Sequence, residues 1–310
     1  MLWQKILFIL FLIVCLFLSP PVALLLGLVS ALTYGNPFPA QTKVATKYLL
    51  QGSVVLLGFG MNLTAVVKAG KDGIAFTIAT IFGTLFLGYF IGKLLKINAK
   101  TSTLISSGTA ICGGSAIAAV APAINADAEE TSVSLGTIFI LNSIALFIFP
   151  IIGHALGLSE NQFGVWAAIA IHDTSSVVGA ATKYGSEALA IATTVKLARA
   201  LWIAPIALFF SYLYRDKGSD KKLKITVPWF IFLFLAATVF RTYAPDIILP
   251  SLYDSIVNLA KAGLTVTLFL IGASLSRETL KKVGIRPLLQ GVLLWLIISI
   301  VSLWAVWKIL

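Results

Sequence analysis

The sequence predicts an all-α polytopic membrane protein, on three observations of composition and pattern. Of its 310 residues, 59% are apolar and 11% are charged, whereas a soluble domain carries about 25% charged residues. Mean hydropathy is +0.98. Long apolar windows alternate with short loops that hold most of the basic residues. A surface so poor in charge is solvated by lipid, which excludes a cytoplasmic enzyme, a nucleic-acid-binding domain and a disordered chain.

Eleven apolar windows are predicted to cross the bilayer as helices. Most approach the ~20 residues that a crossing helix needs, and lipid offers the backbone no other hydrogen-bond partner. The first window also resembles the apolar stretch of a secretory signal, but we expect it to be retained because no clean cleavage site follows. The windows are Ile6–Leu18, Val22–Tyr34, Tyr48–Val67, Ile74–Ile91, Leu104–Ile124, Val133–Ile152, Phe163–Thr182, Ala188–Tyr212, Val227–Phe240, Ile256–Leu275 and Leu288–Trp307.

The distribution of charge predicts an N-terminus in the cytoplasm and a C-terminus outside it. With eleven crossings, most basic residues fall on one side, whereas Lys68, Lys71 and Arg241 are exceptions. Loops rich in Lys and Arg stay in the cytoplasm, so the basic side is the inner one. The basic segments are Lys5, Lys43/Lys47, Lys93/Lys96/Lys100, Arg215–Lys224 and Arg277–Arg286, and the opposing acids are Asp127, Glu129, Glu130, Asp246 and Asp254.

A faint internal repeat favours the architecture of a secondary transporter. Residues 57–64 resemble residues 269–276, with Gly60 matching Gly272 and Asn62 matching Ser274. The two windows run in opposite directions in the predicted topology, as inverted repeats of transporters do. The alternative is a chance similarity between two apolar helices.

Ionisable side chains deep in two neighbouring windows are the first candidate site. A charge at the centre of a membrane helix costs ~2.5–3.5 kcal/mol on insertion scales, so such residues are commonly functional. Four such residues are His172, Asp173, Lys196 and Arg199. All four lie 11 to 14 residues from the turn at Gly185, so helices bring them to the same depth in the bilayer. Another base, Lys261, is expected near the end of its helix.

The charge balance of this cluster argues for an anionic substrate. Lys196 and Arg199 share a helix face and outnumber Asp173, while His172 is expected to be neutral near pH 7. Excess positive charge at the midplane is stabilised when an anion binds there. Lys196 and Arg199 are therefore predicted to bind the substrate, and His172 with Asp173 to couple to an ion. The alternative is structural, a buried ion pair with Arg199 bonded to backbone carbonyls.

Small residues in the fifth window predict a broken helix. Gly113 and Gly114 interrupt it, and Ser115 then caps a second half-helix whose free N–H groups face an anion. The alternative is close packing of helices through small residues. A run of capping residues from Asp173 predicts a second break. The substrate-binding candidates of this group are Cys112, Gly113, Gly114, Ser115, Ser175 and Ser176, with Asn62 and Asn142 as second-tier polar candidates.

No catalytic residue, metal site or cofactor is expected. The two cysteines, Cys15 and Cys112, lie far apart in apolar sequence and give no disulfide framework. His154 and His172 are the only histidines, which is too few for a typical zinc site.

Four segments, taken together, resemble a known family. Gly108–Ala116, Ala126–Glu130, His172-Asp173 and Val195–Arg199 occur in the order and spacing of the YeiH-type bacterial inner-membrane proteins, which are often described as sulfate exporters. The resemblance covers nearly the whole chain. It implies one transmembrane transporter domain, residues 1–310, in which core and panel helices interleave, two broken helices cross, and the core moves like an elevator. The family usually has Glu where this chain has Asp173, which is one methylene shorter.

The leading hypothesis is a secondary active transporter of a small anion such as sulfate or a sulfonate, coupled to protons or sodium. Its expected partners are that anion, the coupling ion, the lipid bilayer and a second copy of the chain, without nucleic acid. Two rivals stay open. One is an intramembrane serine hydrolase built on Ser115 and His172, and the other is a passive anion channel.

Overall fold

The computed structural model describes residues 2–214, 229–244, 249–275 and 283–310. Within these ranges the regular structure is entirely helical, which confirms the predicted class. The helices are α1 (Leu2–Val14), α2 (Pro20–Thr33), α3 (Pro39–Leu57), α4 (Leu63–Leu94), α5 (Ala99–Ala110), α6 (Gly114–Ala123), α7 (Ala128–Ala155), α8 (Glu160–Ala170), α9 (Thr174–Tyr184), α10 (Ser186–Ala200), α11 (Ile203–Leu213), α12 (Trp229–Tyr243), α13 (Pro250–Ser274) and α15 (Ile285–Ile309).

Five stretches of helix are long and apolar enough to cross a membrane, within the residues that could be searched. They lie in α4, α7, the continuous α10–α11 pair, α13 and α15, and shorter apolar helices include α1, α2, α6 and α12. This length and composition are those of a multi-pass membrane protein. Two predicted basic segments, Arg215–Lys224 and most of Arg277–Arg286, lie outside the described residues, as do Asp246 and Ser276.

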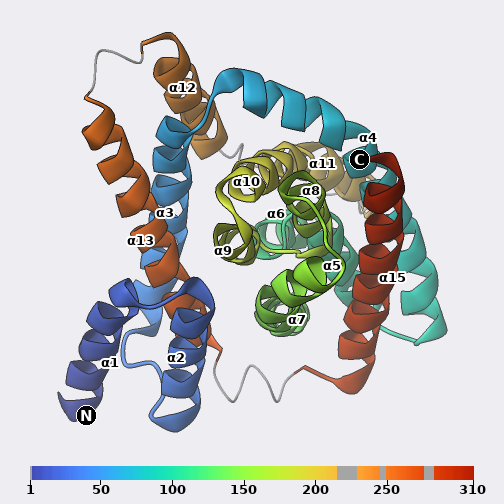
Figure 1. Cartoon of the computed structure of the whole chain (residues 1–310). Helices are drawn as coiled ribbons and strands as arrows, with labels where there is room; N and C mark the ends of the chain where they lie inside the picture. Colours follow the sequence, from blue (N-terminus) through green and yellow to red (C-terminus); the bar gives the residue numbers. More distant parts are fainter. Residues whose placement is uncertain (1, 215–228, 245–248, 276–282) are drawn as a thin grey trace.

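The helices form two groups, which Figure 1 shows on its left and right sides. We call α1, α2, α3, α12 and α13 the panel, and α5 to α11 with α15 the core. Helix α4 starts beside the panel, where the Leu63 N–H donates to the hydroxyl of Thr242 on α12 (2.8 Å), and then runs across to the core. The panel and the core also meet directly, where α13 and α2 contact α9.

Side-chain caps fix the start of several helices. Asn62 accepts a hydrogen bond from the Thr64 N–H at the start of α4, and Asn98 does the same for α5. Asp127 and Ser159 form capping boxes at the starts of α7 and α8. Because these caps bind N–H groups that have no partner inside the helix, they set where each helix begins.

Helices α5 and α6 form a hairpin. The Lys100 ammonium, near the start of α5, donates to the carbonyl of Asn125, just beyond the end of α6 (2.7 Å). Nearer the tip, Gly108 faces Ile117 of the returning helix. Gly113 reverses the chain with φ +69°, a conformation that L side chains rarely adopt. Both ends of this segment therefore lie at the same end of the core.

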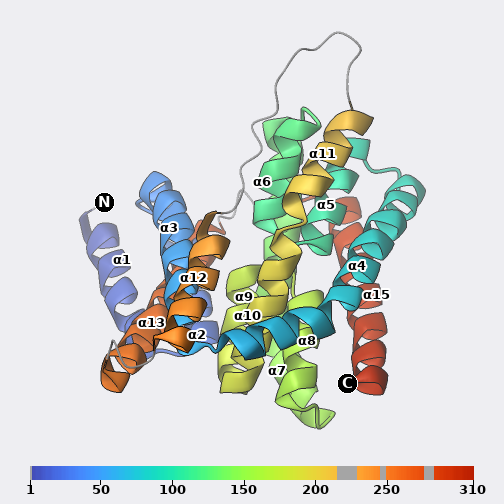
Figure 2. The same cartoon turned by 90° about the horizontal axis from the view of Figure 1, so that it is seen from above.

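Helices α8 and α9 form a second hairpin. The Tyr184 hydroxyl, at the end of α9, donates to the carbonyl of Leu158, before α8 begins (2.6 Å), and the Tyr184 ring stacks on Phe163 with centroids 3.7 Å apart. The Glu160 carboxylate accepts hydrogen bonds from the N–H groups of Glu187 and Ala188, the first turn of α10. In Figure 2, α5 and α6 occupy the upper part of the core, and α8 and α9 lie below them.

The two hairpins correct the predicted crossings of Leu104–Ile124 and Phe163–Thr182. Each window was expected to cross once as a broken helix, but each folds back on itself. The breaks were predicted and are confirmed, whereas the direction of the second half-helix was wrong. A half-helix of 10 to 12 residues spans ~15–18 Å, about half of a ~30 Å hydrocarbon core. An apolar window of 20 residues fits a crossing helix and a half-depth hairpin equally well.

The first hairpin also places one acidic segment at the same end of the core as basic residues from which it was predicted to be separated by the membrane. Asp127, Glu129 and Glu130 were predicted opposite Lys96, yet all four line one surface cavity of about 410 Å³ together with Arg286.

In the panel, α3 and α13 run antiparallel, as predicted for the two similar segments. Gly60 packs against Val257, and Gly263, further along α13, packs against Ser53, earlier in α3. The expected place of Lys261 was wrong, because α13 begins six residues before the predicted window and Lys261 lies near its middle, half-buried.

Candidate functional site

The tips of the two hairpins touch at Gly113. A Cβ atom on this glycine would lie 3.3 Å from the Asp173 Cα atom and 3.4 Å from the His172 carbonyl oxygen. The positive φ of Gly113 strongly favours glycine here, and the close contact leaves little room for a side chain. The four half-helix ends of α5, α6, α8 and α9 meet here, ~15–18 Å from either end of the core by the length of the half-helices.

Two basic side chains of α10 bind the C-terminal carbonyl groups of α8 and α5, the first half-helix of each hairpin. The Lys196 ammonium donates to the carbonyls of Ile171 (2.8 Å) and Ala168 (3.2 Å) at the end of α8. The Arg199 guanidinium donates to the carbonyls of Ala110 and Ile111 at the end of α5. Both bases are fully buried.

These contacts explain why the bases are tolerated at this depth. The carbonyl end of a helix carries a partial negative charge of about half an elementary charge, and a cation there is stabilised. Lys196 and Arg199 lie three residues apart on α10, so one face of that helix reaches both hairpin tips. Arg199 also donates to the hydroxyl of Thr80 on α4 (2.6 Å). The sequence left open a structural role in which Arg199 binds backbone carbonyls, and the contacts of Arg199 are of this kind.

Asp173 caps the second hairpin's returning helix. Its carboxylate accepts hydrogen bonds from the Ser176 N–H (3.1 Å) and from the hydroxyls of Ser175 and Ser176. The predicted run of capping residues is thus confirmed at the start of α9. All three side chains are buried, and both hydroxyls bind the cap.

Asn142 on α7 binds the backbone at the same break, between α8 and α9. Its Oδ1 atom accepts hydrogen bonds from the N–H groups of His172 (3.0 Å) and Asp173 (3.3 Å). Its Nδ2 atom is buried and has no hydrogen-bond partner within the described residues. The same holds for both ring nitrogens of His172, which is fully buried. His172 therefore makes no hydrogen bond to Ser115.

The start of α6 differs from the other half-helix start because no side chain caps it. Gly113 is the N-cap residue, and the prediction that Ser115 would cap this helix is wrong. Ser115 is the second residue of α6 and is exposed, whereas Cys112 at the break is buried. The first N–H groups of a helix have no partner inside it. The Ala116 N–H bonds to the Cys112 sulfur, so those of Gly114 and Ser115 are available to another acceptor.

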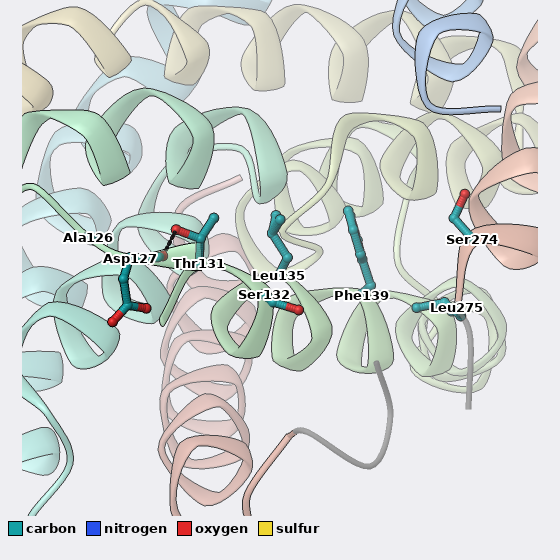
Figure 3. Close-up of a pocket in the computed structure, with 8 residues that line it drawn as sticks. All are labelled: Ala126, Asp127, Thr131, Ser132, Leu135, Phe139, Ser274 and Leu275. Carbon is teal, nitrogen blue, oxygen red and sulfur yellow. Dashed lines mark hydrogen bonds between the residues drawn. The ribbon is translucent and has the colours of Figure 1, made fainter. Parts of the chain in front are cut away.

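A groove of about 440 Å³ runs along α7 beside this helix start (Figure 3). Asp127 and Thr131 lie at one end of the row of α7 side chains, and Phe139 lies at the other, near Ser274 and Leu275 of α13. The groove thus lies between core and panel. Its inner side chains also contact the hairpin tip, because Leu135 and Phe139 lie within 3.4 Å of the Cβ position of Gly114.

The structure therefore brings together most of the predicted site. Asn62 is the exception, since it is exposed at the start of α4 and makes a local cap. Sequence reasoning missed Thr80, Leu135 and Phe139. The last two were detectable in principle, because they lie at helical spacing before Asn142 and share its face.

The comparisons with known proteins identify the family. A family model described as "Conserved hypothetical protein 698" matches residues 12–291. The chain belongs to this family.

This chain and its relatives are similar to each other over most of their length. It is 58% identical to a UPF0324 membrane protein of Bacteroides thetaiotaomicron, over 92% of this chain and 85% of that protein. It is 50% identical to a UPF0324 membrane protein of Vibrio vulnificus, over 96% of both. The YeiH-type resemblance seen in the motifs is consistent with this family. No solved structure matches the chain.

Proposed function

We propose that the protein is a secondary active transporter of a small anion, which binds where the hairpin tips meet. The observation that carries this proposal is a set of hydrogen-bond donors without acceptors. The start of α6 at Gly113 has no side-chain cap, and Gly113 contacts Asp173. Asn142 binds the N–H groups of His172 and Asp173 through Oδ1, while its Nδ2 atom has no partner among the described residues. Backbone N–H groups at a helix N-terminus bind anions, and an amide donor adds a directed hydrogen bond.

Lys196 and Arg199 support such a site through the half-helices. By neutralising the carbonyl ends of α5 and α8, they leave the positive N-terminal ends of α6 and α9 to dominate the local field. Asp173 already caps α9, so the open donor end is that of α6. In this proposal the two bases act on the anion electrostatically, and Ser115 is the hydroxyl that reaches it.

We further propose nine crossings and two re-entrant hairpins. The crossings are α1, α2, α3, α4, α7, the α10–α11 pair, α12, α13 and α15. Backbone that reverses inside a membrane is tolerated where it is buried in protein, as both tips are. The N-terminus lies in the cytoplasm and the C-terminus outside, since Lys43, Lys47, Lys93, Lys96 and Lys100 keep the predicted side. The membrane is the bacterial inner membrane.

Transport by an elevator-type movement fits the division into core and panel. Both hairpins belong to the core, and the groove toward Phe139 lies between core helix α7 and panel helix α13. In the proposed orientation that groove opens toward the cytoplasm, which corresponds to an inward-facing state. His172 and Asp173, at the second tip, are the proposed coupling pair for a proton or a sodium ion. A homodimer is the proposed assembly.

An enzymatic role is not favoured by this geometry. A serine nucleophile needs a base within hydrogen-bond reach, and neither ring nitrogen of His172 has a partner in the described chain. Proton-coupled movement of an anion needs no catalytic group or cofactor.

The test is labelled sulfate flux into proteoliposomes, with and without pH and sodium gradients. The matched variants are Arg199→Gln and Lys183→Gln, because Lys183 is an exposed base on the same hairpin–helix unit. A transporter gives saturable, gradient-driven flux that Arg199→Gln abolishes and Lys183→Gln leaves unchanged. Flux that follows the gradient without saturation indicates a channel and overturns the proposal. If neither sulfate nor any of a panel of sulfonates and carboxylates moves, the proposal fails.

A further inference from the structure

The face of α7 that lines the groove continues without interruption to the hairpin tips. Thr131, Leu135, Phe139 and Asn142 are spaced by four, four and three residues, so they form one stripe along the helix. The first three line the groove, and Figure 3 shows them in a row along α7. The stripe changes from polar at the mouth to apolar at Leu135 and Phe139, and then to the amide of Asn142.

The inner end of this stripe offers a buried donor. Asn142 Oδ1 accepts from two backbone N–H groups, which fixes the orientation of the amide and leaves Nδ2 as a donor. This side chain is 3% exposed, and Nδ2 has no partner in the described part of the chain. A buried donor without an acceptor is unfavourable, so an anionic oxygen that binds Nδ2 stabilises this site.

The wall beyond the mouth is mainly apolar. Leu135, Phe139 and, directly after α13, Leu275 line it beside the hydroxyls of Ser132 and Ser274. Phe139 lies next to Gly114 at the start of α6. The volume of about 440 Å³ lies in the range of about 300–1,000 Å³ that holds organic ligands. An inorganic oxyanion gains nothing from an aromatic ring, whereas an organic anion buries its apolar part against it.

We propose that the substrate is an organic monoanion, a sulfonate or carboxylate with an aromatic or branched apolar body. Its anionic group binds the start of α6 and Asn142 Nδ2, and its body packs on Leu135 and Phe139 from the groove side. This inference rests on the proposed transport function and specifies the substrate class of the same site. Inorganic sulfate is then a weak ligand.

The experiment measures binding to, and uptake by, the full chain in proteoliposomes with three probes: sulfate, methanesulfonate and benzenesulfonate. The wild-type protein is expected to bind benzenesulfonate at least tenfold more tightly than methanesulfonate, because only the former carries an apolar body. Phe139→Ala is expected to weaken benzenesulfonate binding roughly tenfold, in line with the loss of one aromatic pair and its buried area, and to change methanesulfonate binding less than threefold.

Two further variants separate the role of the ring from that of the fold. Phe147→Ala removes the same side chain from α7 at a position that does not line the groove, so it is expected to leave the benzenesulfonate preference unchanged. Phe139→Leu keeps an apolar wall and is expected to lose only part of the preference. Asn142→Ala is expected to weaken all organic probes alike, because it removes the donor for the anionic group.

The possible failures are distinguishable. If sulfate moves with saturable kinetics and benzenesulfonate neither moves nor competes, the organic substrate is wrong and the transport proposal stands. If methanesulfonate and benzenesulfonate bind equally and Phe139→Ala alters neither, the apolar wall has no role and the inference fails. If none of the three probes and no member of the sulfonate and carboxylate panel binds or moves, both the inference and the transport function fail.

Discussion

Gly113 and Asp173 touch at the point where the two helical hairpins meet, with the Cβ position of Gly113 3.3 Å from the Asp173 Cα atom. Each residue is the N-cap of the second half-helix of its own hairpin, Gly113 of α6 and Asp173 of α9. This contact places an uncapped helix start beside a capped one.

The hairpin architecture predicts which loops share a side of the membrane. Lys96, Glu129 and Glu187 are all exposed. The cysteines of Lys96→Cys and Glu129→Cys are expected to react with a membrane-impermeant maleimide from the same side of the membrane. The cysteine of Glu187→Cys is expected to react from the opposite side. Labelling of right-side-out and inside-out vesicles measures this. The wild-type chain is the control, since Cys15 and Cys112 are both buried. Labelling of Lys96→Cys and Glu129→Cys from opposite sides would restore the crossing of residues 104–124.

Gly113→Ala is expected to destabilise the protein by roughly 1–3 kcal/mol, the cost of a side chain in a conformation that is nearly restricted to glycine. The added Cβ also presses on Asp173 and His172. Thermal unfolding in detergent measures the change. Gly83→Ala is the matched control, because Gly83 lies inside α4 with open space around it and an ordinary φ. An unchanged unfolding temperature for Gly113→Ala would contradict the tip geometry.

Arg199→Lys is expected to impair transport although it keeps the positive charge. The guanidinium reaches the carbonyls of Ala110 and Ile111 and the hydroxyl of Thr80 at once, and an ammonium lacks that planar fork. Leaving one buried carbonyl unbonded costs about 1–3 kcal/mol. Flux and unfolding temperature are measured on the same preparation. Full activity in Arg199→Lys would show that charge alone matters here.

Asp173→Asn is expected to preserve the fold and uncouple transport. Asparagine caps helices about as well as aspartate, so the bond from the Ser176 N–H survives while the charge is lost. Substrate binding is then retained, and accumulation against a gradient disappears. Equilibrium binding and gradient-driven uptake are compared with those of wild type. If Asp173→Asn still accumulates substrate at the wild-type level, the coupling group lies elsewhere.

Much of the site could be predicted because each signal was local. The pair Gly113-Gly114 weakens a helix locally, and Asp173 followed by Ser175 and Ser176 favours a helix start, so both breaks were detectable. The partners of Lys196 and Arg199 were not, because the carbonyls of Ile171 and Ala110 lie 25 and 89 residues away in the chain. No local pattern encodes a bond from a side chain to a distant helix end.

The sequence by itself determined that this is a helical, multi-pass membrane protein with two broken helices and a buried charged cluster. Composition, apolar window length and capping residues decide these properties within one segment at a time. Only the tertiary structure decided that the broken helices are hairpins, that the bases bind helix ends, and that a groove along α7 leads to the tips. Those depend on which distant surfaces pack together, since an apolar stretch of 20 residues is equally satisfied by crossing a bilayer and by folding back within a protein core.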